Sequence, residues 1–328
     1  IGWCDWSSDV CSSDLIGELY FGASVNGAFN KSEVLDLQNT EKVLKGGDGG
    51  FGQSELIYVQ VGLPMGVFFG VQTDGIFQNQ AEVDSYVNST GGKIQPNARP
   101  GDIRFVDANG DGTISDGDRV QIGSPLPDFT GGLNLNAEIY GFDFNMFLYA
   151  ALGQEIYGAT RRYDMNYANY PAEWLDRWTG EGTSDTYPRV TFADNNLNGK
   201  TVSDFYIQDG SFIRLRNITL GYSLPQNITN AIKLSKLRLY VSAENLYTFT
   251  KYTGYDPEIG GGVFDNGIDR GINPQPRTIM TGKTNECCVF ESIAHMFSIT
   301  ILVKSVFGQH RFQSILASVS FIRNHYNI

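Results

Sequence analysis

Residues 131–150 read GGLNLNAEIYGFDFNMFLYA and decide the fold. Every second residue from Leu133 to Ile139 is apolar, with Asn and Glu between them, and after Gly141 the alternation resumes and continues to Leu148. Side chains of a β-strand point alternately to opposite faces, so this period of two predicts two strands, each with one apolar and one polar face. The glycine between them marks a tight turn.

The same alternation recurs along the chain. Besides 131–140 and 142–150 it predicts strands at 18–27, 217–224 and 237–249, with weaker candidates at 54–61, 66–72 and 276–284. The longest of these exceed the usual length of about 5–6 residues in globular proteins. They suit tilted membrane-spanning strands of about 9–11 residues.

The connections between these strands alternate in length. Short turns are predicted near 62–65, 140–142 and 225–236, and long polar segments at 30–53, 73–129, 151–210 and 250–275. Short turns at one end and long loops at the other are typical of outer-membrane barrels. A soluble β-sandwich also alternates, but loops longer than about 12–15 residues are uncommon in compact domains. The pattern favours an all-β protein, a partial transmembrane antiparallel β-barrel of about eight strands with long extracellular loops.

The composition changes sharply at both ends of the chain. Residues 16–284 contain no Cys and no His, whereas all 4 Cys and all 3 His lie in the flanks. We interpret residues 1–15 as an artefact that resembles a translated sequencing adaptor, and 285–328 as a frameshifted or read-through tail. The alternatives are a genuine N-terminus with two reactive thiols and a disulfide or metal site at Cys287 and Cys288.

Charge and residue types exclude several classes of function. A net charge of −12 disfavours a nucleic-acid partner, because phosphate binding depends on Lys and Arg. A body without His or Cys cannot hold a Ser-His-Asp, Cys-His or His-ligated metal site. A glycosidase with paired carboxylates stays a background possibility. We therefore expect that the protein is not an enzyme.

Residues 107–118, DANGDGTISDGD, match the D-x-[DN]-x-[DN]-G calcium loop, with Gly112 giving the sharp turn at position 6. Oxygen-bearing residues stand at loop positions 1, 3, 5, 7, 9 and 12: Asp107, Asn109, Asp111, Thr113, Ser115 and Asp118. Aspartate in place of glutamate at position 12 predicts weaker binding. We expect a structural Ca²⁺ here, and the alternative is an Asp/Asn/Gly-rich turn without an ion.

Two weaker motifs have structural explanations. Gly47 to Gly52 fits the dinucleotide pattern G-x-G-x-x-G but precedes a strand, which predicts a flexible loop. Trp174 and Trp178, four residues apart, predict a short helix that packs an extracellular loop. A sugar-binding aromatic platform is the alternative there.

Several ordered motifs resemble the C-terminal part of SusC/RagA-type TonB-linked outer-membrane proteins. They are PMGVFFG at 64–70, TDGIFQ at 73–78, PGDIRFVD at 100–107, IGSPLPDF at 122–129, GSFIRLRNITLGY at 210–222, ENLYT at 244–248, YTGYDPE at 252–258, GID at 267–269 and PQPR at 274–277. The resemblance covers 16–284. It implies a plugged barrel of the 22-stranded type in the cell outer membrane of Bacteroidota.

The resemblance also implies function and partners. Such proteins import oligosaccharides or peptides with energy from the TonB complex, and a SusD-like lipoprotein covers their extracellular loops. The plug and the TonB-interacting segment find no counterpart here, so we expect the polypeptide as written neither to insert nor to transport. The alternative is a secreted, calcium-stabilised β-rich glycan-binding module. A barrel would place Leu133, Leu135, Leu220, Leu237 and Leu239 against lipid, whereas the module would bury them between two sheets.

Overall fold

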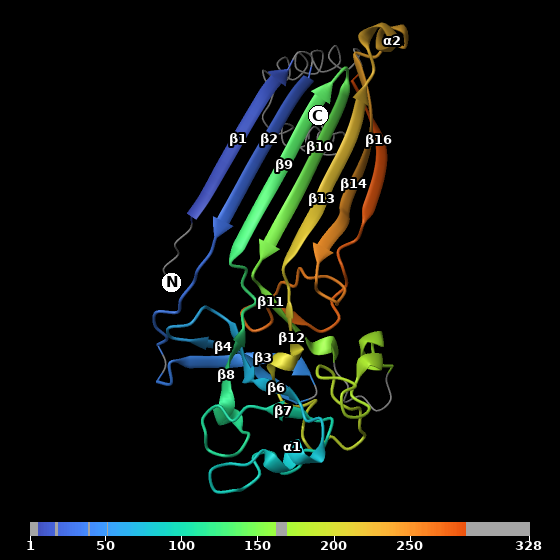
Figure 1. Cartoon of the computed structure of the whole chain (residues 1–328). Coiled ribbons are helices and arrows are strands. Elements are labelled where there is room, and N and C mark those ends of the chain that lie inside the picture. The colour runs from blue at the N-terminus through green and yellow to red at the C-terminus, as the bar shows by residue number, and fades with distance from the viewer. Residues whose placement is uncertain (1–5, 17–18, 39, 51, 162–168, 287–328) are drawn as a thin grey trace, which may run out of the picture.

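A seven-stranded antiparallel sheet forms the longest part of the molecule (Figure 1). The computed structural model describes residues 6–16, 19–38, 40–50, 52–161 and 169–286. In spatial order the strands are β1 (Trp6–Ile16), β2 (Leu19–Phe29), β9 (Phe129–Ile139), β10 (Phe142–Leu152), β13 (Phe212–Ser223), β14 (Lys236–Thr250) and β16 (Thr278–Glu286). The all-β fold is thus confirmed. None of the helices in the described segments is long and apolar enough to cross a bilayer.

The two strands that opened the sequence analysis pair as predicted. Phe142 lies opposite Ile139, so β9 and β10 are joined by a two-residue hairpin. Both turn residues have positive φ, 49° at Tyr140 and 82° at Gly141, which is the conformation of a type I′ turn. A side chain at Gly141 would meet the Ser223 carbonyl oxygen at 2.7 Å, so glycine is required by space as well.

Short and long connections lie at opposite ends of the sheet (Figure 1). The turn at Tyr140 and helix α2 (Gln226–Ala231) lie at one end. The described residues of 30–128, 153–211 and 251–277 lie at the other, and we call them the loop domain. The short turns predicted at 140–142 and 225–236 therefore lie opposite the long connections. The turn predicted at 62–65 joins two strands of the loop domain, so 30–53 and 73–129 belong to one long connection.

Strand β1 pairs with β2 along its whole length. It includes residues 6–15, which we interpret as adaptor-derived. Backbone pairing depends little on sequence, and the free edge of a strand accepts any extended segment. The assignment of 1–15, and of the tail from 285, stays a prediction. Cys287, Cys288 and the rest of the tail lie outside the described residues.

The loop domain is built from three small sheets and short helices. β3 (Val43–Gly50), β4 (Gln53–Gln60), β5 (Val67–Val71) and β8 (Arg119–Gly123) form one sheet, β6 (Thr73–Ile76) and β7 (Ile103–Phe105) another, and β12 (Ile207–Asp209), β11 (Glu155–Gly158) and β15 (Ile268–Asp269) the third. The helices are α1 (Gln80–Ser85), η1 (Asp116–Asp118), η2 (Ala159–Arg161), η3 (Ala172–Asp176) and η4 (Asp204–Tyr206).

The core of the loop domain is assembled from all three long connections. Its buried members are Leu56, Ile57, Phe68, Tyr157, Ala159, Val202, Tyr206 and Ile268. Segments about 200 residues apart therefore fold as one unit, which a set of independent loops would not do.

Two predicted barrel strands were wrong. The candidates at 54–61 and 66–72 are β4 and β5, and they belong to the loop domain. β5 is only 5 residues long, and residues on both of its faces are buried. A short apolar run indicates a strand but does not say which sheet the strand joins.

Candidate functional site

The long sheet has one apolar and one polar face, and the pairing registers keep them separate across the strands. One row of opposed residues runs Phe21, Ala137, Phe144, Leu220 and Val241. The leucines named in the sequence analysis lie on this apolar face. Leu220, Leu239 and Val241 are 54%, 48% and 51% exposed. A sandwich would bury such residues, so the exposed apolar face supports the barrel reading over the secreted module.

The polar face carries a ladder of hydrogen bonds between strands. Asn145 on β10 donates from its amide to Asn134, at 3.2 Å, and to Asn136 on β9. Thr219 on β13 donates its hydroxyl to Ser242 on β14 at 3.2 Å. Side-chain amides and hydroxyls thus satisfy one another over the middle of this face, which keeps it hydrophilic.

An arginine clamp holds the last long connection against the polar face. Arg214 on β13 is 2% exposed and donates from Nη1 to Glu258 at 2.8 Å and from Nη2 to Asp256. Its Nε donates to the Thr248 hydroxyl at 3.0 Å, and the guanidinium lies 5.2 Å from the centroid of the Phe212 ring. Each of the three nitrogens of this buried cation therefore has a partner.

The carboxylates of the clamp also organise their own loop. Asp256 accepts from the backbone amide of Glu258 at 2.9 Å and from that of Gln275 at 2.9 Å. Arg216, two residues beyond Arg214, bonds the second oxygen of Glu258. Arg214 thus holds Asp256 near the beginning of 251–277, and Asp256 in turn binds Gln275 near its end.

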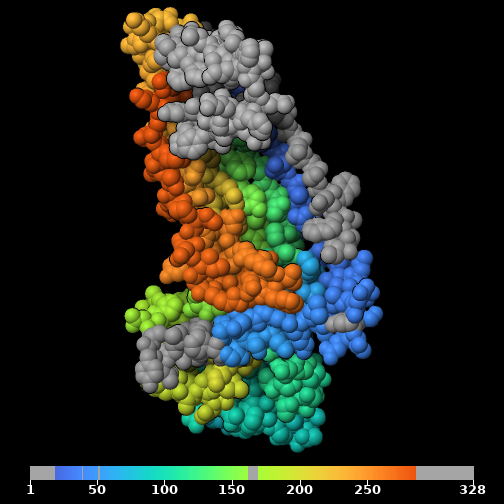
Figure 2. Space-filling view, turned by 180° about the vertical axis from the view of Figure 1, so that it is seen from behind, coloured from blue at the N-terminus to red at the C-terminus, as the bar shows by residue number. Residues whose placement is uncertain are grey.

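The same connection also reaches the rest of the loop domain. Figure 2 shows its orange residues spread over the lower part of the long sheet and against the blue residues below. β15 pairs in parallel with β11, and Arg270 donates from Nε to the Asp48 carbonyl at 2.7 Å. Tyr252 donates its hydroxyl to Asp269, and burial, followed by this bond, raises the pKa of Tyr252. Residues 251–277 therefore tie the sheet to the loop domain.

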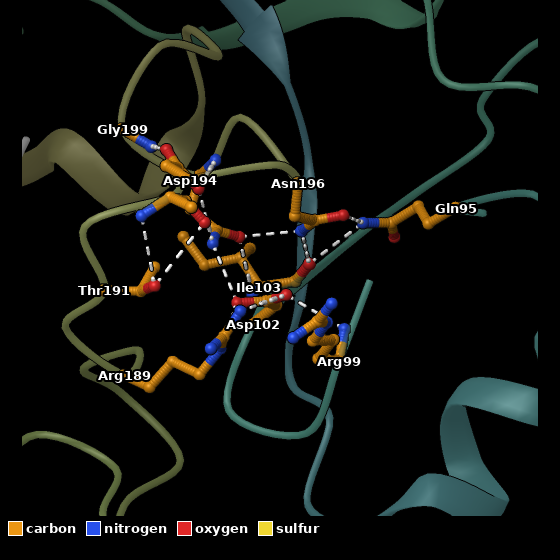
Figure 3. A network of polar contacts seen from close by, with 11 residues as sticks. Gln95, Arg99, Asp102, Ile103, Arg189, Thr191, Asp194, Asn196 and Gly199 are labelled. Atoms are coloured by element: carbon orange, nitrogen blue, oxygen red, sulfur yellow. Dashed lines mark hydrogen bonds and ion pairs between the residues drawn. The ribbon is translucent and has the colours of Figure 1, made fainter. Parts of the chain in front are cut away.

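A buried aspartate joins two other long connections (Figure 3). Asp102 is fully buried, and Arg189 donates to it from Nε at 2.7 Å and from Nη2 at 3.3 Å. The Asn198 amide donates to the same carboxylate at 3.0 Å, and the Arg99 backbone at 2.9 Å. Asp194 closes the neighbouring turn by accepting from the backbone amide of Asn198. This network is structural, because its groups are occupied by one another.

The predicted calcium residues lie in one compact turn that is closed by hydrogen bonds. Buried Asp118 accepts from the backbone amides of Ala108, Asn109 and Ser115 at 2.9, 3.2 and 2.7 Å. Asp107 accepts from two glycine amides, each at 2.8 Å. The backbone therefore wraps around these two carboxylates.

The outer side of this turn is more open. Asp111 accepts from the Thr113 hydroxyl at 2.8 Å and the Thr113 amide at 2.9 Å, and these bonds lower the pKa of Asp111. Gly112 has a φ of 88°, which confirms the predicted sharp turn. Within the described residues, no three His, Cys, Asp or Glu side chains are arranged to hold a metal ion. The calcium hypothesis stays a prediction.

The tryptophan motif packs a loop, as predicted. Trp174 lies in η3, is 2% exposed, and contacts the rings of Tyr187 and Phe205. Trp178 donates its ring N–H to Gln78 at 3.2 Å. Because Trp174 is covered, the pair cannot serve as a flat sugar platform.

Comparison with known proteins gives the same assignment. No family model matches the chain. TonB-dependent receptor P3 of Formosa agariphila is 31% identical over 271 residues, which cover 80% of this chain and 26% of the receptor. TonB-dependent receptor SusC of Bacteroides thetaiotaomicron is 35% identical over 187 residues, 56% of this chain and 17% of the receptor. The chain thus spans about a quarter, or less, of the length of these relatives.

Solved structures agree on the fold. A chain of the RagAB peptide importer in the open-open state superposes with a TM-score of 0.64 at 19% identity, over 85% of this chain and 28% of that one. These relatives bear the names of receptors and an importer, not of enzymes. By sequence and fold together, the chain belongs with the SusC/RagA-like TonB-dependent receptors of the outer membrane, of which it matches a β-barrel segment.

Proposed function

We propose that this segment forms part of the wall and the extracellular rim of an outer-membrane transporter that imports glycans or peptides. The observation that carries the proposal is the register of the long sheet, which separates a lipid-facing apolar surface from a hydrophilic one. From Phe142 to Leu152 the apolar face runs ten residue steps, roughly 33 Å at about 3.3 Å per residue. A tilt of about 40° reduces this to roughly 25 Å, the height of the apolar band in such barrels.

The loop domain is the surface that a SusD-like lipoprotein would cover. It lies at the end of the sheet that carries all the long connections, and its segments share one core. A rigid rim suits a partner that docks repeatedly. The TonB complex would act through a part of the receptor that this segment does not match.

The function is tested on the receptor gene that carries this segment. Deleting the gene should abolish growth of the host on one class of nutrient, glycan or peptide, and leave growth on glucose and free amino acids unchanged. The purified receptor should retain a lipoprotein partner. Unchanged growth on every polymer, together with a receptor that purifies alone, would contradict the proposal.

We also propose that the polypeptide as written is inactive. In the described residues the long sheet ends at β1 and β16, each with one unpaired edge, and lipid cannot satisfy such edges. Expressed in a Gram-negative host, the chain should be absent from the outer membrane and degraded. A stable, protease-resistant band in that fraction, which shifts in a gel on heating, would show that it inserts.

We propose that Ca²⁺ tightens the turn at 107–118. Each carboxylate has about four lone-pair sites, and Asp107 and Asp111 keep some after their internal bonds. In the receptor, Ca²⁺ should slow proteolysis of this turn relative to a chelator, and Asp111→Asn should abolish the difference. Equal cleavage with Ca²⁺ and with chelator would leave the turn ordered by its hydrogen bonds alone.

A further inference from the structure

A pocket of about 480 Å³ lies between the arginine clamp and the connection that it holds. Arg214, Thr248 and Thr250 form its floor on the polar face of the sheet, and residues 254–257 and 274–277 form its walls. The pocket thus opens on the hydrophilic side of the sheet, at the end that carries the loop domain. If the segment lines a transport path, a substrate entering from outside passes this end of the sheet before the opposite end.

Three charged residues line the pocket, Arg214, Asp256 and Arg277. Arg214 and Asp256 neutralise each other. The Arg214 guanidinium is held by Asp256 and by Glu258, which lies outside the lining. Both Asp256 oxygens are already occupied by Arg214 and by backbone amides. Arg277 is the remaining charge. No hydrogen bond or ion pair in the described part of the chain engages its guanidinium.

The groups beside Arg277 complete a binding surface. Tyr255 is 74% exposed and lines the same pocket, and the Asn245 amide donates to the Pro276 carbonyl at 3.2 Å. Prolines at 257, 274 and 276 limit the backbone freedom of the walls. A guanidinium without a partner, in a pocket that also holds an aromatic side chain and polar groups, suits a carboxylate, which accepts two parallel N–H bonds.

We propose that this pocket is a substrate subsite for a carboxylate, with Arg277 as its counter-charge and Tyr255 as its wall. The inference rests on the proposed transport function and adds the chemistry of one substrate group. A uronic acid of a glycan and an acidic or C-terminal residue of a peptide both supply this group.

The test uses the full receptor, purified with its lipoprotein partner, and two matched pairs of probes. One pair is tetragalacturonate and its methyl ester, and the other is an N-acetylated, C-amidated glutamate tripeptide and its glutamine counterpart. Calorimetry should show that one acidic probe binds at least about tenfold more tightly than its neutral counterpart, and which pair does so identifies the source of the carboxylate. Arg277→Gln should remove that preference, a loss of about tenfold, or ~1.4 kcal/mol.

Two variants serve as controls. Arg277→Lys keeps the charge and should retain most of the preference. Lys251→Gln removes an exposed cation of the same connection outside the pocket and should leave binding unchanged. A wild-type receptor that binds neither acidic probe, or an Arg277→Gln variant that keeps the preference, overturns the inference. Growth on glycans or peptides is measured in parallel, so that the transport proposal is tested independently of the subsite proposal.

Discussion

Replacing Arg214 by methionine should free residues 251–277 from the polar face of the sheet. Methionine fills much of the same volume without the charge. The change removes every bond that the guanidinium makes to Asp256, Glu258 and Thr248. It leaves a carboxylate that is 8% exposed, Asp256, without its cation.

The size of this destabilisation depends on the hydrogen bonds that each carboxylate keeps after the substitution. Breaking a buried ion pair costs roughly 3–5 kcal/mol. Asp256 retains two backbone amides at 2.9 Å, which places the cost at the lower end of this range. The Glu258 side chain is 34% exposed and keeps Arg216, so solvent screens its share. We expect the free energy that holds 251–277 in place to fall by about 3 kcal/mol, or roughly a hundredfold in the open population.

Hydrogen exchange of the receptor in lipid nanodiscs measures this population, because amide protection reports local opening. Peptides from 251–277 should lose about two orders of magnitude of protection, while those from β9 and β10 stay unchanged. Arg216→Met is the matched control. Its side chain is 37% exposed and should cost only about 0–1 kcal/mol. Unchanged protection in Arg214→Met, or equal losses in the two variants, would refute the clamp.

Three further predictions test other parts of the structure. On the apolar face, Leu220→Arg should destabilise the folded receptor by about 2–4 kcal/mol, whereas Ser24→Arg on the polar face should be tolerated, as measured by the heat-shifted gel band. Asp102→Asn breaks the pair with Arg189 and should cost about 2–4 kcal/mol, seen as faster proteolysis near 189–199; unchanged cleavage would contradict it. Burial raises the pKa of Glu155 above the ordinary value of 4.5, so the folded state holds its proton to higher pH than the unfolded chain. Protonation of Glu155 should therefore stabilise the loop domain as pH falls toward 4.5, and Glu155→Gln should remove this contribution from the pH profile of thermal melts.

The strands of the long sheet can be predicted from the sequence because the alternation of apolar and polar residues is a local pattern. Alternation assigns a face to each residue from its neighbours, and a glycine after a long run marks the hairpin. β9, β10 and β14 were therefore predicted to within a few residues. β13 was predicted from 217, but it begins at Phe212. Adjacent Arg216 and Asn217 break the alternation there, and the structure has a β-bulge at this point.

The loop domain could not be derived in the same way. Its core joins residues from three connections, and no local pattern pairs Leu56 with Tyr157 or Ile268. Its polar contacts are equally distant in sequence, since Asp102 and Arg189 are separated by 87 positions. Local pattern therefore predicts only long polar segments at 73–129 and 151–210, and it indicates neither the Asp102 network nor the clamp.

A local signal for the clamp was nevertheless present in the motif FIRLRN. Arg214 and Arg216 alternate with Ile213 and Leu215, so both cations fall on the face opposite the apolar one. Arg214 is buried, and a buried cation requires anions. Its strand partners, Tyr149 on β10 and Thr248 on β14, carry no charge. The anions come from a long connection that folds back over the polar face. The sequence Asp256-Pro257-Glu258 provides two carboxylates two residues apart, the same spacing as the arginines. Paired cations on a polar strand face therefore indicate a connection that returns to the sheet, and they locate where it is held.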